Sequence, residues 1–182
     1  VCIVDGVFQW PSAIDAVTQA SKQAAAAPTA PLSSLDTPTL HHVNLAVQPR
    51  ELAVVAGPTG CGKSSLLSAV LGEIRRCGGG VQAHGRISYV PQRAQIFNQS
   101  LRDNILFGQP MDEARYNAVL EACALTSDLR LLPDGDLTEI GERGVNLSGG
   151  QQQRVNLARA CYARTDIILL DDVLSAVDGH VG

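Results

Sequence analysis

The sequence lacks a long apolar run, an excess of positive charge and a paired-cysteine motif, and each absence removes a class of protein. No apolar stretch approaches the roughly 18 residues that a membrane-spanning helix needs. The formal net charge of −4 predicts no basic surface for nucleic acid or an anionic membrane, so no nucleic-acid partner is expected. The five cysteines include no C-x-x-C pair and no histidine at zinc spacing, which favours a reducing, cytosolic setting.

An initiator methionine and a signal-peptide layout are also missing at Val1–Asp5, so we expect an excerpt from a longer polypeptide. The 182 residues suffice for one domain, with or without a small subdomain, and 45% hydrophobic residues are ordinary for an α/β protein. Between Ser12 and Pro38 the chain is rich in Ala, Ser, Thr and Pro, which predicts a flexible, solvated insertion.

The most informative segment is Gly57–Ser64, because it matches the phosphate-loop pattern G-x-x-x-x-G-K-[ST]. Ahead of it, Glu51–Ala56 has the character of a short buried strand, and behind it Ser65–Leu71 has that of a helix with buried leucines. The glycines therefore lie at a strand-to-helix turn, and the expected ligand is a nucleoside triphosphate. The alternative is a glycine-rich turn between a core strand and a core helix.

Phosphate binding explains the residue types in this loop. Glycines adopt backbone angles closed to other residues, so successive N–H groups can turn toward phosphate oxygens, and the helix N-terminus adds a positive dipole. Lys63 is expected to reach the β- and γ-phosphates, and the Ser64 hydroxyl to ligate Mg²⁺. Cys61 is either a reactive thiol or a small filler residue. The expected nucleotide contacts here are Gly57, Pro58, Thr59, Gly60, Cys61, Gly62, Lys63, Ser64 and Ser65.

Alternation of strands and helices around the loop predicts an α/β fold with a mainly parallel core sheet and an inserted helical subdomain at 96–147. An antiparallel β portion is expected at the N-terminus. The expected strands are Asn44–Val47, Leu52–Ala56, Arg86–Val90 and Ile167–Leu170, and the expected helices are those beginning at the Ser100–Asp103 capping box, Ala114–Leu125 and Gly150–Ala163.

Two further segments contain residues suited to binding a metal ion or an anion. Asp171 and Asp172 follow the strand Ile167–Leu170, at the sheet edge where Mg²⁺ would need a carboxylate; the alternative is a pair of solvated acids. Leu147–Arg154 (LSGGQQQR) is a glycine-kinked turn that opens a helix, and so a second potential anion site.

Leu147–Arg154 resembles the signature motif of ATP-binding-cassette (ABC) ATPases, and it stands between the phosphate loop and Asp171 in the family's order. The resemblance covers essentially the whole chain except Ser12–Pro38. It implies that Gln92 is the Q-loop glutamine, which touches Mg²⁺ and the attacking water, and that Ser175–Asp178 is the D-loop. It also implies that the signature residues, Ser148, Gly149, Gly150 and Gln151, address ATP held by a partner domain.

Trp10 looks like the family's A-loop aromatic, whose ring stacks on adenine; the alternative is ordinary core packing. Thr138–Gly144 is similar to the exporter X-loop, and Ser100–Gly108 resembles an exporter segment that follows the Q-loop. The switch histidine of the family lies beyond the end of this chain, and His180 does not match it.

The chain looks like the first nucleotide-binding domain of subfamily C, the multidrug-resistance-associated-protein group. That domain commonly has an aspartate in place of the usual glutamate general base, and Asp172 stands at this position here. The shorter side chain predicts strong ATP binding with slow hydrolysis. The expected catalytic residues are Asp172, Gln92 and Lys63, and the expected Mg²⁺ ligands are Ser64, Gln92 and Asp171.

The implied function is to power efflux of organic anions, conjugates or drugs, on the cytosolic face of a membrane. The expected partners are a second, head-to-tail nucleotide-binding domain and transmembrane domains. The alternatives are a regulatory ABC domain that gates a channel and a soluble ABC ATPase.

Overall fold

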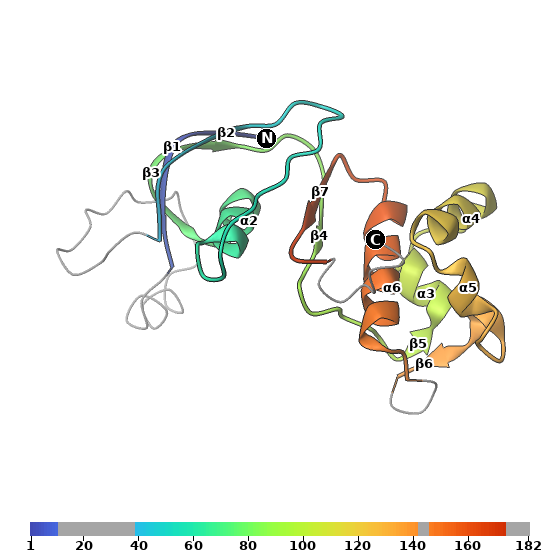
Figure 1. Cartoon of the computed structure of the whole chain (residues 1–182). Helices are drawn as coiled ribbons and strands as arrows, with labels where there is room; N and C mark the ends of the chain where they lie inside the picture. Colours follow the sequence, from blue (N-terminus) through green and yellow to red (C-terminus); the bar gives the residue numbers. More distant parts are fainter. Residues whose placement is uncertain (11–38, 142–145, 174–182) are drawn as a thin grey trace, which may run out of the picture. The chain divides into compact units, whose positions relative to one another are not determined.

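The computed structural model describes residues 1–10, 39–141 and 146–173, which fall into an N-terminal unit, Val1–His84, and a C-terminal unit, Gly85–Gly182 (Figure 1). Four expectations lie wholly or partly outside these ranges: the insertion at 12–38, the D-loop at 175–178, the second half of the X-loop, and residues 142–145 of the helical subdomain at 96–147. In the described part of the chain, no helix is both long and apolar enough to cross a membrane.

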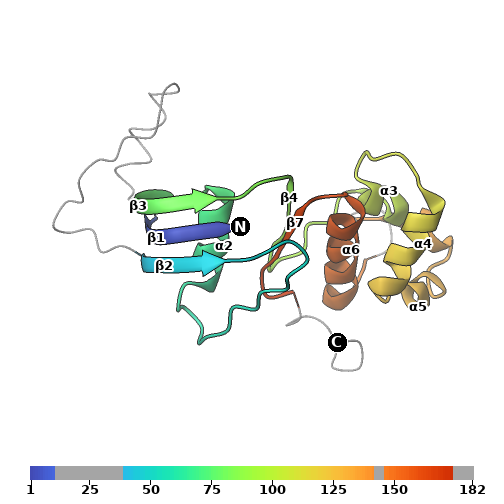
Figure 2. The ribbon, with the colours of Figure 1, turned by 90° about the horizontal axis from the view of Figure 1, so that it is seen from above.

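The N-terminal unit is built on a three-stranded antiparallel sheet in the order β2-β1-β3, which confirms the antiparallel β portion (Figure 2). Its strands are β1 (Cys2–Gln9), β2 (Leu40–Ala46) and β3 (Arg75–Gln82). Glycine-rich β3 is not apparent from the sequence, because glycine weakens strands. One glycine in β3 is nevertheless required: Gly79 has φ +69°, and a Cβ there would collide with the Asp5 carbonyl of β1.

Helix α2 (Lys63–Leu71) packs against β3 and buries Ser68, Ala69 and Val70. It ends where Gly72 adopts the left-handed conformation at φ 78°, and Glu73 N–H donates to the Ser68 carbonyl. This is the glycine-terminated helix end that an αL residue provides. Since α2 begins at Lys63, inside the phosphate-loop motif, this helix and the sheet it packs against hold the loop's C-terminal end.

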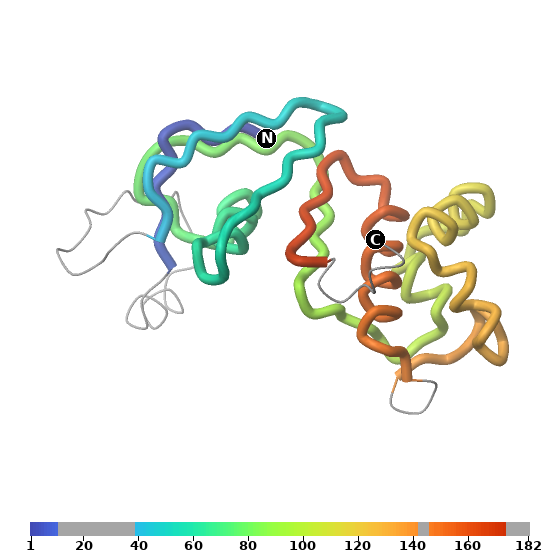
Figure 3. The backbone as a smooth tube through the Cα atoms, viewed as in Figure 1, coloured from blue at the N-terminus to red at the C-terminus, as the bar shows by residue number. Residues whose placement is uncertain are grey.

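The expected buried strand at 52–56 does not form. The segment has no regular strand, and Leu52 and Val54 are 83% and 80% exposed. Figure 3 traces it as a long connection between β2 and α2. An apolar run sets a tendency, but a strand is stabilised by a hydrogen-bonded neighbour. The described strands pair with one another and not with this segment, so the loop is entered from an irregular, exposed chain.

The C-terminal unit contains the parallel pairing. Its strands are β4 (Ile87–Val90), β7 (Ile167–Leu170), β5 (Gln99–Ser100) and β6 (Glu139–Ile140). Its helices are α3 (Leu101–Leu106), α4 (Glu113–Ala122), α5 (Thr126–Leu129), the 3₁₀ turn Gly135–Leu137 and α6 (Gly149–Tyr162). The expected mainly parallel sheet is limited, among the described strands, to β4 with β7, while β5 and β6 pair antiparallel.

Helix α6 is the centre of this unit: it lies between the β4–β7 pair and helices α3 and α4 (Figures 1 and 2). The expected helix at 114–125 instead ends at Ala122, and Ala124 adopts a positive φ of 53° before α5 begins. Apolar residues of α3, α4, α6 and the link from α4 to α5 form one buried cluster, which includes Leu101, Ile105, Tyr116, Leu120, Cys123, Leu125, Val155, Ala158 and Tyr162.

Candidate functional site

The phosphate loop forms an exposed turn whose shape depends on its glycines. Gly60 and Gly62 have φ of +82° and +100°, and a Cβ on Gly62 would lie 2.9 Å from Leu40 Cδ2. Gly62 is also the N-cap of α2, which has no side-chain cap and no acidic residue in its first turn. The amide end of α2 therefore keeps its full partial positive charge, which suits an anion.

Lys63 adds a cation to this helix end. Its ammonium donates to the carbonyls of Gly57 and Pro58, each at 2.9 Å, and lies 4.0 Å from the Cys61 sulfur. Both carbonyls are neutral, exposed acceptors of the loop itself, so a phosphate oxygen can replace them at little cost. The loop thus places the lysine charge beside the amides that an anion would meet.

Trp10 lies beside the first turn of α2. Its indole Nε1–H donates to Ser65 Oγ at 3.1 Å, so the structure brings together two of the expected nucleotide contacts. Trp10 is 45% exposed, which disagrees with ordinary core packing. An exposed indole anchored at its edge leaves ring area for a flat partner.

In the C-terminal unit, the parallel register of β4 with β7 aligns Val90 with Leu170, so the residues that follow both strands emerge together. Asp171 is 9% exposed, and its backbone N–H donates to the Val90 carbonyl. Its carboxylate accepts a hydrogen bond from the Tyr89 hydroxyl at 3.1 Å. The Gln92 amide donates to Asp172 Oδ2 at 2.9 Å. The expected Q-loop glutamine and both acids are therefore neighbours.

Helix α6 contacts the segment that carries Gln92. Gln153, only 2% exposed, donates its side-chain amide to the Pro91 carbonyl at 3.1 Å, immediately before Gln92. Its own oxygen is one of three buried side-chain polar atoms without a hydrogen bond among the described residues. This contact was not apparent from the sequence, because no motif marks the inward face of the helix.

The signature motif forms the start of α6. Ser148 is the N-cap, and with Gln151 it makes a reciprocal capping box: Gln151 N–H donates to Ser148 Oγ, and Ser148 N–H donates to Gln151 Oε1 at 2.9 Å. Gln151 also donates to Asp128, and Arg154 pairs with the same carboxylate through two nitrogens. Arg154 and Asp128 keep only 12% and 11% of their side chains exposed. A buried carboxylate on α5 therefore fixes the first turn of α6.

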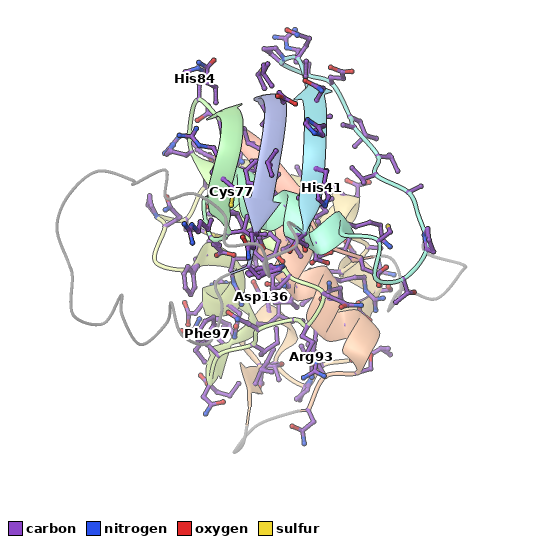
Figure 4. All side chains as sticks on the ribbon, turned by 90° about the vertical axis from the view of Figure 1, so that its left-hand side faces the viewer. His41, Cys77, His84, Arg93, Phe97 and Asp136 are labelled. Carbon is purple, nitrogen blue, oxygen red and sulfur yellow. The ribbon has the colours of Figure 1, made fainter. Side chains whose placement is uncertain are left out.

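Two aromatic rings form an exposed patch elsewhere on this unit. Phe97 and Phe107, 41% and 56% exposed, have ring centroids 5.3 Å apart, and the Arg159 guanidinium lies 5.1 and 5.2 Å from them. Burial lowers the pKa of Arg159, whose guanidinium also donates to the Asn104 side chain and carbonyl. Figure 4 shows the side chains as sticks and labels Phe97. Phe107 belongs to residues 100–108, whose sequence resembles the segment that follows the Q-loop in exporters.

The donor set fits a magnesium nucleotide when each unit is considered by itself. The N-terminal unit carries the glycine turn, the helix end, Lys63 and Ser64, which are the groups that phosphate and Mg²⁺ require. The C-terminal unit holds Asp171, whose carboxylate oxygen is a hard donor, beside Gln92 and Asp172. Ser64 belongs to one unit, and the other two expected Mg²⁺ ligands, Gln92 and Asp171, belong to the other.

This loop and fold define a phosphate-loop nucleotide-binding protein. The sequence profile of the ABC transporter family matches residues 40–175, and the chain belongs to that family. It is 58% identical over 144 residues to ATP-binding cassette sub-family C member 3 of Rattus norvegicus, and 59% identical over 146 residues to sub-family C member 4 of Homo sapiens. A 56% identical relative is ABC transporter C family member 3 of Dictyostelium discoideum. These matches cover about 80% of this chain. The chain spans only about a tenth of each relative's length.

Proposed function

We propose that this chain binds MgATP and hydrolyses it slowly, as part of the nucleotide-binding domain of a subfamily C exporter. The observation that carries the proposal is the glycine-shaped loop at the uncapped end of α2, with Lys63 held beside it. The subfamily follows from the relatives of about 58% identity. Figure 1 shows the loop's position between β2 and α2.

In this proposal each residue of the site has a stated task. The loop amides and Lys63 bind the phosphates, and the Trp10 ring faces adenine. Ser64, Gln92 and Asp171 are the residues that would hold Mg²⁺, and the ion would supply positive charge to neutralise the phosphate charge that develops during hydrolysis. Asp172 accepts a proton from water, and its hydrogen bond from Gln92 fixes the position of the carboxylate.

Slow hydrolysis follows from the length of Asp172, because an aspartate lies one methylene farther from water than the usual glutamate. Asp172→Glu, placed in the full-length transporter, is expected to raise the rate of phosphate release. The gain is bounded by the roughly 10²–10⁴-fold that general-base catalysis supplies. Asp172→Asn is the matched control and is expected to lower the rate. An Asp172→Glu rate equal to that of the parent would refute the assignment.

The signature residues address a second nucleotide-binding domain. We place Ser148, Gly149, Gly150 and Gln151 opposite ATP bound by a head-to-tail partner, with the capping box keeping the first turn of α6 in shape. The Ser148 hydroxyl oxygen accepts from Gln151 N–H within the cap, and its proton remains a donor for phosphate. Closure by ATP and release after hydrolysis would change the membrane domains between two states.

Contact with the transmembrane domains is assigned to the Q-loop, the X-loop and the Phe97–Phe107 patch. The two rings are exposed although each is apolar, and a partner helix would cover them. The helical segment 96–147, which supplies this patch, is proposed to be the inserted subdomain. Efflux of organic anions, conjugates or drugs from the cytosolic side is the corresponding transport activity.

A regulatory ABC domain that gates a channel is the second candidate, and Asp172 favours it as much as it favours a weak half-site. Transport into inside-out vesicles separates the two: ATP-dependent substrate accumulation against a gradient requires a pump. ATP-dependent ion conductance without accumulation would favour the channel. The same assay with Lys63→Ala shows whether either activity depends on this domain's nucleotide.

A further inference from the structure

Helix α6 buries a glutamine to which the proposed function gives no task. Gln153 is 2% exposed, and its side-chain amide donates to the Pro91 carbonyl at 3.1 Å. Its Oε1 has no hydrogen-bond partner among the described residues. A buried amide with an unpaired oxygen is less stable than an apolar side chain of similar shape. The stability of the core alone therefore does not account for a glutamine at this position.

The segment that Gln153 contacts has few other anchors. The Val90 carbonyl, at the end of β4, accepts a hydrogen bond from the backbone that follows β7, and the Gln95 carbonyl accepts one from a guanidinium of α6. Between these two points, the bond from Gln153 is the one hydrogen bond that the main chain of residues 91–94 makes with the described part of the protein. A proline has no N–H, so a donor to its carbonyl is the anchor available there.

This anchor lies one residue before the expected Q-loop glutamine. Gln92 follows Pro91 directly, is exposed, and donates its own side-chain amide to Asp172 Oδ2 at 2.9 Å. An exposed side chain keeps one position at a smaller entropy cost when the backbone that carries it is already fixed. The bond from Gln153 to Pro91 therefore favours the hydrogen bond between Gln92 and Asp172.

We propose that Gln153 is a positioning residue, which holds the Q-loop segment against α6 and so keeps Gln92 in place for Mg²⁺ and Asp172. The inference rests on the proposed function, which assigns Gln92 to the metal. Helix α6 begins after its N-cap Ser148, and Gln153 lies about 7.5 Å farther along the helix axis. The same helix then carries the turn that faces the partner's nucleotide and the residue that holds this domain's own Q-loop.

The first test replaces the glutamine and follows the segment directly. Gln153→Leu removes both the donor and the unpaired oxygen, and water can reach the carbonyl of half-buried Pro91, so the urea midpoint should stay unchanged or rise. Arg93, labelled in Figure 4, is exposed, and trypsin cleavage after it reports on local opening of the segment. We expect this cleavage to become about three- to tenfold faster. Cleavage after the exposed Arg130 is the internal reference and should not change.

Asn156→Leu is the matched control. Asn156 is a second buried amide of α6, 4% exposed, and its Nδ2 has no partner among the described residues. Its oxygen accepts from Arg159 of the same helix at 3.1 Å, and the Q-loop segment receives no hydrogen bond from it. Cleavage after Arg93 should therefore equal that of the parent chain. Gln153→Met is a second variant, and circular dichroism checks folding; failure of both Gln153 variants to fold would make the residue structural and overturn the proposal.

ATP binding tests the connection to Gln92. Equilibrium dialysis of the chain in Mg²⁺ and in EDTA gives the factor by which the metal tightens ATP binding. Gln153→Leu and Gln92→Ala should each lower this factor about three- to tenfold without changing the affinity in EDTA. The double variant should lose no more than Gln92→Ala, because Gln153 acts through Gln92.

Additive losses in the double variant, or unchanged cleavage after Arg93 in Gln153→Leu, would overturn the proposal. A parent chain whose ATP affinity is the same with and without Mg²⁺ would instead contradict the proposed function. In that case cleavage after Arg93 would still decide whether Gln153 holds the segment.

Discussion

The phosphate loop and the signature turn are the two helix ends proposed to bind anions, but they are held in opposite ways. The loop before α2 is exposed from residue 51 to residue 61, and the Lys63 ammonium donates to the loop's own carbonyl groups and to Cys61. The turn before α6 is fixed by a capping box and by the buried Asp128 carboxylate on a neighbouring helix. One helix end has its shape from glycine backbone angles, and the other from side-chain hydrogen bonds.

This difference suggests that the two turns have different roles in ligand binding and in stability. A loop whose contacts are few, neutral and exposed can exchange them for phosphate without a large penalty. A turn fixed by a buried ion pair presents the same groups whether or not a ligand is near, which costs little entropy on binding. We therefore expect substitutions in the signature turn to change stability first, and substitutions in the phosphate loop to change binding first.

The largest expected effect is that of Asp128→Ala. Removing the carboxylate leaves Arg154 mostly buried and unpaired, so the free energy of unfolding should fall by about 3–5 kcal/mol. Urea denaturation followed by circular dichroism measures it. The matched control is Arg164→Ala, which breaks an exposed ion pair with Asp112, 61% and 41% exposed, and should cost at most about 1 kcal/mol. Equal losses in the two variants would contradict the assigned role of burial.

Next in size is Lys63→Ala. The charge-assisted hydrogen bonds from Lys63 to phosphate are worth about 1.5–3 kcal/mol, so affinity for ATP should fall by about 10- to 150-fold. Equilibrium dialysis with labelled ATP measures the affinity. The urea midpoint should stay unchanged, because among the described residues the hydrogen bonds of the Lys63 ammonium go to its own loop. A clear shift of that midpoint would show that the loop is fixed by Lys63 after all.

The smallest expected effect distinguishes the glycines of the two turns. Gly62→Ala forces a positive φ on alanine and brings Cβ to 2.9 Å from Leu40, which should cost about 1–2 kcal/mol of stability. Gly149→Ala meets nothing within 4 Å and replaces a glycine inside helix α6, so stability should change by less than about 1 kcal/mol or rise. Thermal melts of the two variants side by side test this, and a larger loss for Gly149→Ala would contradict it.

Local signals explain what the sequence predicts well. The phosphate loop, the Ser148 cap and the strand Ile167–Leu170 are encoded within a few residues, and α6 and β7 lie within one residue of the expected bounds. Ser100 likewise caps α3 as expected, accepting from Asp103 N–H at 3.0 Å. Each of these depends on a capping residue or on a run of apolar residues.

Contacts between distant segments explain what the sequence does not predict. Asp128 lies 26 residues before Arg154, and no spacing rule links them. Strand β3 forms because β1 provides a partner, despite three consecutive glycines, while the apolar run at 52–56 stays irregular without one. The contacts of Tyr89 with Asp171 and of Gln153 with Pro91 depend on the packing of α6 and the register of β4 with β7.

The central claim is that the loop before α2 binds the phosphates of ATP while Trp10 faces its adenine. Trp10 is the only tryptophan, so its intrinsic fluorescence reports on this site during a titration with MgATP. The account predicts a saturable change that is lost in Lys63→Ala, with circular dichroism showing that both chains are folded. A folded chain whose fluorescence stays constant while dialysis detects bound ATP would contradict the role of Trp10, and a folded chain that binds no ATP would contradict the central claim itself.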